Sequence, residues 1–415
     1  MPVPRLSVLS LRALGGLRPL ALVWALGGAA LAADMPAPAT LAGALEQAWR
    51  QHPLAAGLDA RMAEARAALD LAGAATPQPA AVTVGHLNDR LHRNLGRREW
   101  ELELAVPLWL RGQQDARRDD AQGRIQLATA QRAALRLTLA GSLREAWWAL
   151  AGARASLALA GRKHETAQAL YRNVQRRHSA GELSRIDANL AQGEVLLAEA
   201  ELAGAQAAVR QAEQALQLLT GSPAPPVLAE EAAAAPRPGE THPLLQVAGA
   251  AADSAQAHLR LSLATPRAAP ELAVRVLRER ADLTERYGNQ VGLRLTVPFA
   301  MGAQIRRDTS AAQAEVAEAD AQRQRASDRL ALDLERAQQL IDTQERLLRV
   351  AAERVALASD SLHLAEKAFA LGESDLATLL RLRNTAFDAL GAHERQRIGH
   401  AAARSALNQA LGALP

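Results

Sequence analysis

The side chains that most often carry catalytic or metal chemistry are present in this sequence but are not grouped. The ten histidines are scattered, and neither an H-E-x-x-H pair nor another clustered ligand set occurs. His86 and His92 flank an expected surface loop, and His393 and His400 are seven residues apart on one expected helix face. We expect each to be an ordinary surface histidine, so the sequence predicts no metal site and no cofactor.

Signatures of enzymes are also missing from the sequence. There is no Gly-rich phosphate loop and no G-x-S-x-G nucleophile motif, and no acid pair is held by a recognisable scaffold. The chain has no cysteine, which excludes thiol catalysis, disulfides and a lipidated N-terminal cysteine. We therefore expect a protein that is not an enzyme.

The first 32 residues have the composition of a secretory signal peptide. Arg5, Arg12 and Arg18 give a basic start, "LALVWALGGAALA" is an apolar core, and Ala30-Leu31-Ala32 fits an A-x-A cleavage site. The core is shorter than the ~20 residues of a spanning helix, which favours a cleaved signal over a retained anchor. Without these arginines the 48 basic residues fall to 45 against 44 acidic residues, so no nucleic-acid partner is expected.

The prolines divide the remainder of the chain. All 19 lie outside two windows, Leu108 to Ser222 and Phe299 to Leu414. Proline disrupts a helix interior by about 3 kcal/mol or more, and the windows are rich in alanine, leucine, arginine, glutamate and glutamine, which favour helix. Each window therefore predicts very long helices.

The two halves of the chain repeat one another, so one architectural unit occurs twice. The linker between the units, Ser222 to Glu240, is rich in proline and alanine. Three of the matching pairs are separated by 191 residues. The matches are His52-Pro53-Leu54 with His242-Pro243-Leu244, Val106-Pro107-Leu108 with Val297-Pro298-Phe299, Gly181-Glu182 with Gly372-Glu373, and Gly221 with Gly412.

A heptad pattern runs through both windows and predicts coiled-coil packing, with a row of large residues beside a row of mostly small ones. A single apolar stripe would fit an ordinary core helix, but a register kept in both halves favours a coiled coil. The second half has Leu334, Ile341, Leu348, Val355, Leu362 and Phe369 beside Leu330, Ala337, Gln344, Ala351, Ala358 and Ala365. The first half has Leu143, Leu150, Leu157, His164, Tyr171 and His178 beside Leu139, Ala146, Ala153, Ala160, Ala167 and Val174.

Each window also contains a turn signal, a glycine followed by a polar cluster. The signals are at Gly181 and Gly372. Ser184, and either Ser374 or Asp375, are expected to cap the returning helices. Each half is thus predicted to form an antiparallel helical hairpin.

Two strand-like runs precede each hairpin. In "EWELELAV", Trp100, Leu102, Leu104 and Val106 share one face, and three glutamates share the other. This alternation fits a barrel with an apolar and a charged face, at lengths close to the ~9–11 residues of a spanning strand. It fits equally a pair of amphipathic hairpins packed on helices outside the membrane. Since open strand edges are not tolerated in lipid, four spanning strands would have to share one barrel with further copies of the chain.

These patterns predict a mainly α fold with a small β part, built from a duplicated strand hairpin and long helical hairpin. The predicted organisation is: signal peptide 1–32; first repeat 33–221, with strands near 81–88 and 98–107 and a helical hairpin near 113–220 with its tip near 181; linker 222–240; second repeat 241–415, with strands near 271–278 and 289–298 and a hairpin near 303–412 with its tip near 372.

In the order of its motifs, the mature chain resembles the outer membrane factor family, the TolC-like proteins. The resemblance rests on the His-Pro-Leu starts, on the strand-ending prolines Pro107 and Pro298 with glycine corners Gly112 and Gly302, on the two glycine turns and on the closing glycines. It implies a homotrimer with a 12-stranded outer membrane β-barrel and a periplasmic α-helical tunnel. The corners would mark the change from barrel to tunnel.

The resemblance further implies two partners, a periplasmic adaptor protein and an inner membrane pump of the RND type. The hairpin tips would form the periplasmic entrance and contact the adaptor. By match these are Gly181, Glu182, Leu183 and Ser184, with Gly372, Glu373, Ser374 and Asp375.

An entrance gate is a further expectation from the resemblance. Asp187 matches an acidic tip position and is the candidate, although an exposed acid favoured by the helix dipole explains it as well. Some members of the family carry an acidic ring beyond the second tip glycine, where this chain has Thr378 and Arg381.

The cargo is the least defined expectation. "RERADLTERYGNQVGLRLTVPF" looks closest to the branch that serves heavy-metal cation pumps. Drug efflux and type I protein secretion are alternatives within the conduit class, and a periplasmic coiled-coil scaffold that never enters the membrane is an alternative outside it. The resemblance places the protein in the outer membrane of a Gram-negative bacterium, with most of its mass in the periplasm.

Overall fold

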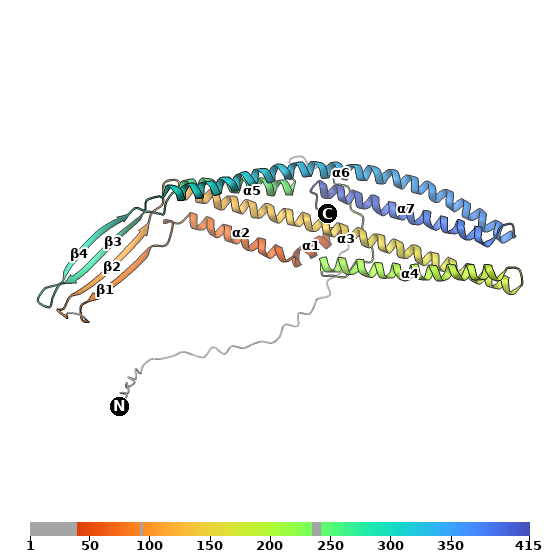
Figure 1. Ribbon diagram of the computed structural model, residues 1–415, viewed down its shortest axis with the longest axis horizontal. Coiled ribbons are helices and arrows are strands. Elements are labelled where there is room, and N and C mark those ends of the chain that lie inside the picture. The colour runs from red at the N-terminus through yellow and green to blue at the C-terminus, as the bar shows by residue number, and fades with distance from the viewer. Residues whose placement is uncertain (1–39, 92–93, 235–241) are drawn as a thin grey trace, which may run out of the picture. The chain divides into compact units, whose positions relative to one another are not determined.

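The computed structural model describes residues 40–91, 94–234 and 242–415, and in this part the fold is mainly helical with one small sheet (Figure 1). The predicted fold class is confirmed: a strand hairpin followed by a long helical hairpin occurs twice. The predicted signal peptide lies outside the described residues. The elements in chain order are α1 (Leu41–Gln51), α2 (Pro53–Ala72), β1 (Ala81–Asn88), β2 (Arg98–Pro107), α3 (Gln113–Ser179), α4 (Arg185–Thr220), α5 (Pro243–Ala264), β3 (Glu271–Arg280), β4 (Gly288–Thr296), α6 (Gly302–Leu371) and α7 (Leu376–Ala410).

The long helices α3 and α6 contain 67 and 70 residues, which corresponds to about 100 Å each at ~1.5 Å per residue. α3 packs against α4 and α6 against α7, so each repeat contains one antiparallel hairpin. The heptad prediction is confirmed by burial along α6. Four alanines of the companion row, Ala337, Ala351, Ala358 and Ala365, are buried. In the row of large residues Phe369 is buried and the others are half-buried.

Both hairpins turn where the sequence predicted. Gly181 and Gly372 have φ angles of 82° and 78°, a left-handed conformation that costs a side-chain-bearing residue energy. Ser184 caps α4 and Asp375 caps α7, each by accepting a hydrogen bond from the backbone three residues on. Of the two residues offered for the second cap, Asp375 is therefore the correct one.

Three shorter helices, α1, α2 and α5, were not predicted and explain the His-Pro-Leu repeat. His52 and His242 are the N-caps of α2 and α5, and each accepts a hydrogen bond through Nδ1 from the amide two residues later. The proline that follows each histidine occupies the first helical turn, where its missing N–H costs nothing. α2 packs on α3, and α5 packs on both α3 and α6.

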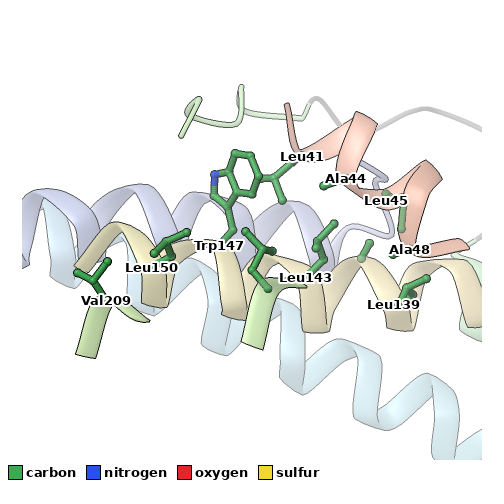
Figure 2. Close-up of a cluster of buried hydrophobic side chains, with 11 residues drawn as sticks. Leu41, Ala44, Leu45, Ala48, Leu139, Leu143, Trp147, Leu150 and Val209 are labelled. Carbon is green, nitrogen blue, oxygen red and sulfur yellow. The ribbon is translucent and has the colours of Figure 1, made fainter. Parts of the chain in front are cut away.

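The main hydrophobic core joins α1 to the first helical hairpin (Figure 2). Trp147, Leu143 and Leu150 of α3 are completely buried there, together with Leu45 of α1. The Trp147 indole Nε1 donates to the carbonyl of Ala229, 3.1 Å away, so the polar end of this buried ring is paired.

The segment predicted as a linker is packed against both repeats in its described part, residues 222–234. Glu231, with 9% of its side chain exposed, forms an ion pair with the equally buried Arg144 of α3. Arg144 also donates to the carbonyl of Ala413, 2.9 Å away, and Ser405 of α7 donates to Glu231 over 2.6 Å. This clamp, Arg144 with Glu231, fastens α3 to the C-terminal part of the second repeat.

Candidate functional site

One face of the sheet is apolar across all four strands. The strands pair antiparallel in the order β1-β2-β3-β4, and their register aligns apolar residues in cross-strand rows. All of these side chains are exposed except Val106, which is half-buried; Val82 is 64% and Leu293 77% exposed. The three rows are Val106–Leu272–Leu295, Val82–Leu104–Val274–Leu293 and Val84–Leu102–Val276–Val291.

The opposite face of the sheet is polar and internally paired. Arg275 of β3 forms ion pairs with Glu101 at 2.6 Å and with Glu99 at 3.8 Å. Arg294 of β4 forms an ion pair with Glu103, whose side chain is only 12% exposed. The charged groups of this face thus neutralise one another.

This arrangement is the reverse of an amphipathic sheet in water. A sheet that covers a soluble core buries its apolar face and exposes its charges, whereas here the apolar rows have no cover among the described residues. The outer strands β1 and β4 each pair with only one neighbour, so each leaves one edge of hydrogen-bonding groups unpaired. A lipid environment for the face and further strands for the edges would satisfy both features.

The four predicted corner residues lie between the sheet and the long helices, in two different arrangements. Pro107 is the last residue of β2 and is paired with Glu271, whereas Pro298 lies two residues beyond the end of β4. Gly112 has a φ of 74° and caps α3, but Gly302 is simply the first residue of α6. The positive φ therefore makes a glycine necessary only at the first corner.

The structure brings the two predicted tips together. Leu170 and Val174 of α3 share one buried cluster with Phe369 of α6 and Leu376 of α7. The guanidinium carbon of Arg177 lies 5.2 Å from the centroid of the Phe369 ring and so bridges the two hairpins. Sequence analysis missed this contact, because each partner alone is an unremarkable residue of its own heptad.

The tip turn of the first hairpin is held by its own hydrogen bonds. Glu182 accepts from Arg177 at 3.1 Å, and the His178 ring Nδ1 is 2.9 Å from the carbonyl oxygen of Leu183. Asp187, the gate candidate, accepts from the amide of Ser184 at 3.0 Å and from its hydroxyl at 2.7 Å. These contacts form a capping box; the gating role of Asp187 stays a prediction.

The capping box gives a local prediction at the tip. Replacing Ser184 by alanine removes the acceptor for the Asp187 amide and should destabilise the start of α4 by about 1 kcal/mol. Hydrogen exchange of the first turn of α4 should accelerate about five-fold. Ser374 provides the matched control, because Asp375 and not Ser374 caps the second hairpin. An S184A variant that exchanges no faster than S374A would contradict the assigned cap.

A second exposed apolar surface, also missed from the sequence, runs along the tip half of α6. Val350, Leu357, Leu364 and Leu371 are spaced by seven residues and are 58–75% exposed. They lie beside the buried alanine row rather than in it. An exposed apolar row with heptad spacing is suited to pack against a further helix in a coiled coil.

Of the histidines singled out in the sequence, His92 lies outside the described residues, and the others have ordinary surroundings. The His86 ring stacks on Trp100 at 4.0 Å, and His400 lies 3.8 Å from Glu345. Within the described residues, no group of three or more potential ligands is arranged to hold a metal ion. Among the described helices, none combines the length and apolar character needed to cross a membrane.

Comparison with known proteins agrees with this geometry. Residues 44–222 match the model of the family described as outer membrane efflux protein. The first repeat of the chain is thus similar to this family. No curated protein matches the sequence.

Solved structures extend the likeness in fold to both repeats of the chain. The outer membrane protein VceC from Vibrio cholerae is 18% identical, with a TM-score of 0.73 over 90% of this chain and 96% of that one. CusC is 15% identical, with a TM-score of 0.75 over 90% and 92%. The outer membrane channel MtrE from Neisseria gonorrhoeae, in its open state, is 16% identical, with a TM-score of 0.72 over 90% and 89%. At these identities the likeness establishes the fold.

Proposed function

We propose that this protein is the outer membrane channel of a tripartite efflux system and conducts substrates from an inner membrane pump and a periplasmic adaptor to the exterior. The observation that carries the proposal is the sheet, with its exposed apolar face, its paired charges opposite and its two open edges. In water, an exposed apolar face and unpaired strand edges would be unfavourable. They are the requirements of a strand assembly whose outside is lipid and whose inside is wet.

The channel is proposed to be a homotrimer. Three four-stranded sheets supply twelve strands, an even number within the range of known membrane barrels. β4 of one protomer would pair with β1 of the next and remove every edge. The exposed α6 row, Val350 to Leu371, would pack against a neighbouring protomer, so the same association would close the helical part as well.

The hairpin tips are proposed as the periplasmic entrance and the adaptor contact. The eight tip residues predicted from the sequence lie at the ends of the two hairpins, and the shared cluster around Phe369 makes the tips one surface. Asp187 is retained as the gate candidate, with its capping role as the alternative. Pro107, Gly112, Pro298 and Gly302 are proposed to mark the passage from barrel to tunnel.

The proposed cargo is heavy-metal cations, delivered by an RND-type pump. Support comes from the sequence of β3, β4 and their connecting loop, which resembles the heavy-metal branch. A wide aqueous passage needs no ligand cluster of its own, so selectivity would belong to the pump. Drug efflux and protein secretion remain as alternative outcomes of the cargo experiment.

Membrane location and assembly can be tested together on the mature protein. We expect it in the outer membrane fraction, soluble only with detergent, and as a trimer that heating converts to a monomer on gels. The reason is that the apolar rows need a lipid environment and the open strand edges need strands of other protomers. Recovery of a water-soluble monomer from the periplasm would overturn the channel and favour a scaffold.

The cargo is tested by deleting the chromosomal copy and measuring growth on zinc, cobalt, cadmium, copper and a panel of drugs. We expect sensitivity to one or more of the metals, with growth on the drugs unchanged. Restoration by the intact gene is the control. Sensitivity confined to drugs would overturn the metal assignment and leave the channel proposal intact.

A further inference from the structure

Beyond the apolar rows, toward the loop ends of the strands, the same sheet face becomes basic and aromatic. The register aligns His86, Trp100, Arg278 and Asn289 in the next cross-strand row. In the row after that, Arg98 of β2 lies directly opposite Arg280 of β3. Since residues two apart on a strand point to the same side, these side chains share the face of the exposed valines and leucines.

Tyr287 orders two of these arginines. The guanidinium carbons of Arg278 and Arg280 lie 4.9 Å and 5.0 Å from the centroid of its ring. Arg280 also donates from Nε to the carbonyl of Gly96, 3.2 Å away, in the loop between β1 and β2. The two strand hairpins are therefore joined at this end, and the positive groups are held in place rather than free.

Among the residues that the structure describes, the positive charges of this cluster form no ion pair with an acid. In the described part of the chain, no carboxylate forms an ion pair with Arg98, Arg278 or Arg280, whereas Arg275 and Arg294 on the polar face are both paired. Asp282, in the loop between β3 and β4, instead accepts hydrogen bonds from Thr284. Those hydrogen bonds are the main reason why its pKa is lowered, and the charge of Arg280 adds to the effect.

Like charges directly opposite one another destabilise a strand pair. Three arginines gathered on one face, with two of them cross-strand partners, are stabilised when an anion binds between them. Guanidinium groups match phosphate oxygens with two parallel hydrogen bonds, which makes phosphate the favoured anion. A phosphate monoester carries about −1.5 to −2 charges at neutral pH and so balances three arginines better than a singly charged phosphodiester.

We infer that Arg98, Arg278, Arg280 and Tyr287 form a binding site, one in each protomer, for the phosphate monoester of a glycolipid of the lipid A type in the outer leaflet. The acyl chains of that lipid would cover the apolar rows, which are continuous with the site on the same face. The inference rests on the proposed channel, because only a sheet embedded with its loops outward meets that leaflet. Neither the family match nor the structural matches assign this site.

The test uses the detergent-purified full-length mature protein, titrated with diphosphoryl lipid A and followed by native mass spectrometry. We expect retained lipid, and about ten-fold weaker binding by the R98Q/R278Q variant, because each lost charge-assisted contact contributes more than a neutral one. R98K/R278K keeps the charges but loses the paired hydrogen bonds, so its affinity should lie between those of the wild type and the glutamine variant. It also shows whether a loss in the glutamine variant reflects misfolding.

Two further arms identify the ligand. R349Q/R354Q removes two exposed arginines of α6 and should bind lipid A as the wild type does, which controls for net charge. Dephosphorylated lipid A should bind about as weakly to the wild type as lipid A does to the double glutamine variant. Equal binding of lipid A by R98Q/R278Q and wild type would overturn the site, and so would inorganic phosphate bound as tightly as the lipid.

Failure of the site and failure of the channel are distinguishable in the same spectra. The mass of the lipid-free protein reports the trimer independently of lipid. A trimer that does not bind lipid A overturns the lipid site but not the channel proposal, whereas a monomer overturns both.

Discussion

Replacing Val82 by arginine is expected to abolish the membrane form of this protein. Val82 lies in the middle of the three apolar rows, opposite Leu104. An arginine on the lipid-facing side of a barrel costs about 2–4 kcal/mol near the bilayer centre, and a trimer would carry three copies. The heat-sensitive trimer recovered from outer membranes should fall at least ten-fold, since about 1.4 kcal/mol corresponds to a factor of ten.

The neighbouring residue supplies the matched control. Thr83 points to the polar face, opposite Glu103, so an arginine there gains a carboxylate neighbour. Thr83→Arg should leave trimer recovery within about two-fold of the wild type. The two variants place the same side chain on opposite faces of β1. A difference between them therefore reports which face meets lipid, and not a general effect of arginine.

The expected result depends on lipid and would not arise in water. Val82 is already 64% exposed in the single chain, and surface substitutions away from special features usually change stability by no more than about 0.5 kcal/mol. If V82R and T83R accumulate equally as folded protein, the apolar face does not meet lipid and the channel proposal fails.

The sequence was sufficient for the parts of the fold that repeat with a regular period. Leu143 and Leu150 belong to the predicted heptad row and are fully buried, and Ala351 and Ala358 belong to the companion row and are buried too. These patterns can be read from the local sequence, because the residues on the buried face of a helix recur with the helical period. The alternation of Trp100, Leu102 and Leu104 likewise defined one strand face.

What the sequence could not determine was the surroundings of those faces. Period-two alternation is the same whether the apolar side meets a helix layer or lipid, so both alternatives were open until the register aligned four strands into uncovered rows. The helices α1, α2 and α5 were missed because they are short and alanine-rich. A histidine before proline, as at His52 and His242, is the capping signal that would have indicated two of them.

Contacts between distant residues were also beyond reach of the pattern. Glu231 lies in a segment whose proline and alanine content is typical of a linker, and Arg144 lies in a long helix with many arginines. Nothing local pairs them, although they are 87 residues apart in sequence and in direct contact in the structure. The arginines of the proposed lipid site pose the same problem, since only strand register shows that Arg98 faces Arg280.

Breaking the clamp between Arg144 and Glu231 is expected to cost more stability than breaking any other ion pair among the described residues. Arg144 donates from Nε to Glu231 at 3.0 Å, and the two side chains are 4% and 9% exposed. Glu231→Gln leaves a buried guanidinium without its counter-charge, which costs about 3–5 kcal/mol. The apparent unfolding midpoint of the detergent-solubilised protein should fall on the order of 5 °C.

The adjacent glutamate is the natural control. Glu230 pairs with Arg404 at 2.9 Å and with Arg397 at 3.5 Å, but its side chain is 52% exposed. Exposed pairs contribute about 0–1 kcal/mol, so Glu230→Gln should barely shift the midpoint. Two identical substitutions one residue apart thus compare a buried with an exposed ion pair.

The pH dependence of the clamp gives an independent check. Burial raises the pKa of Glu231, but hydrogen bonds from Arg144, Ser405 and Asn408 and the charge of Arg144 outweigh it, so the pKa lies below its ordinary value of 4.5. A lowered pKa contributes stability that is present above the unfolded value and is lost as the pH falls through the folded one. The midpoint difference between wild type and E231Q should be full at pH 7 and shrink below about pH 4.5. A difference that stayed constant down to pH 3, or a midpoint of E231Q equal to that of E230Q at pH 7, would show that the pair does not hold the two repeats together.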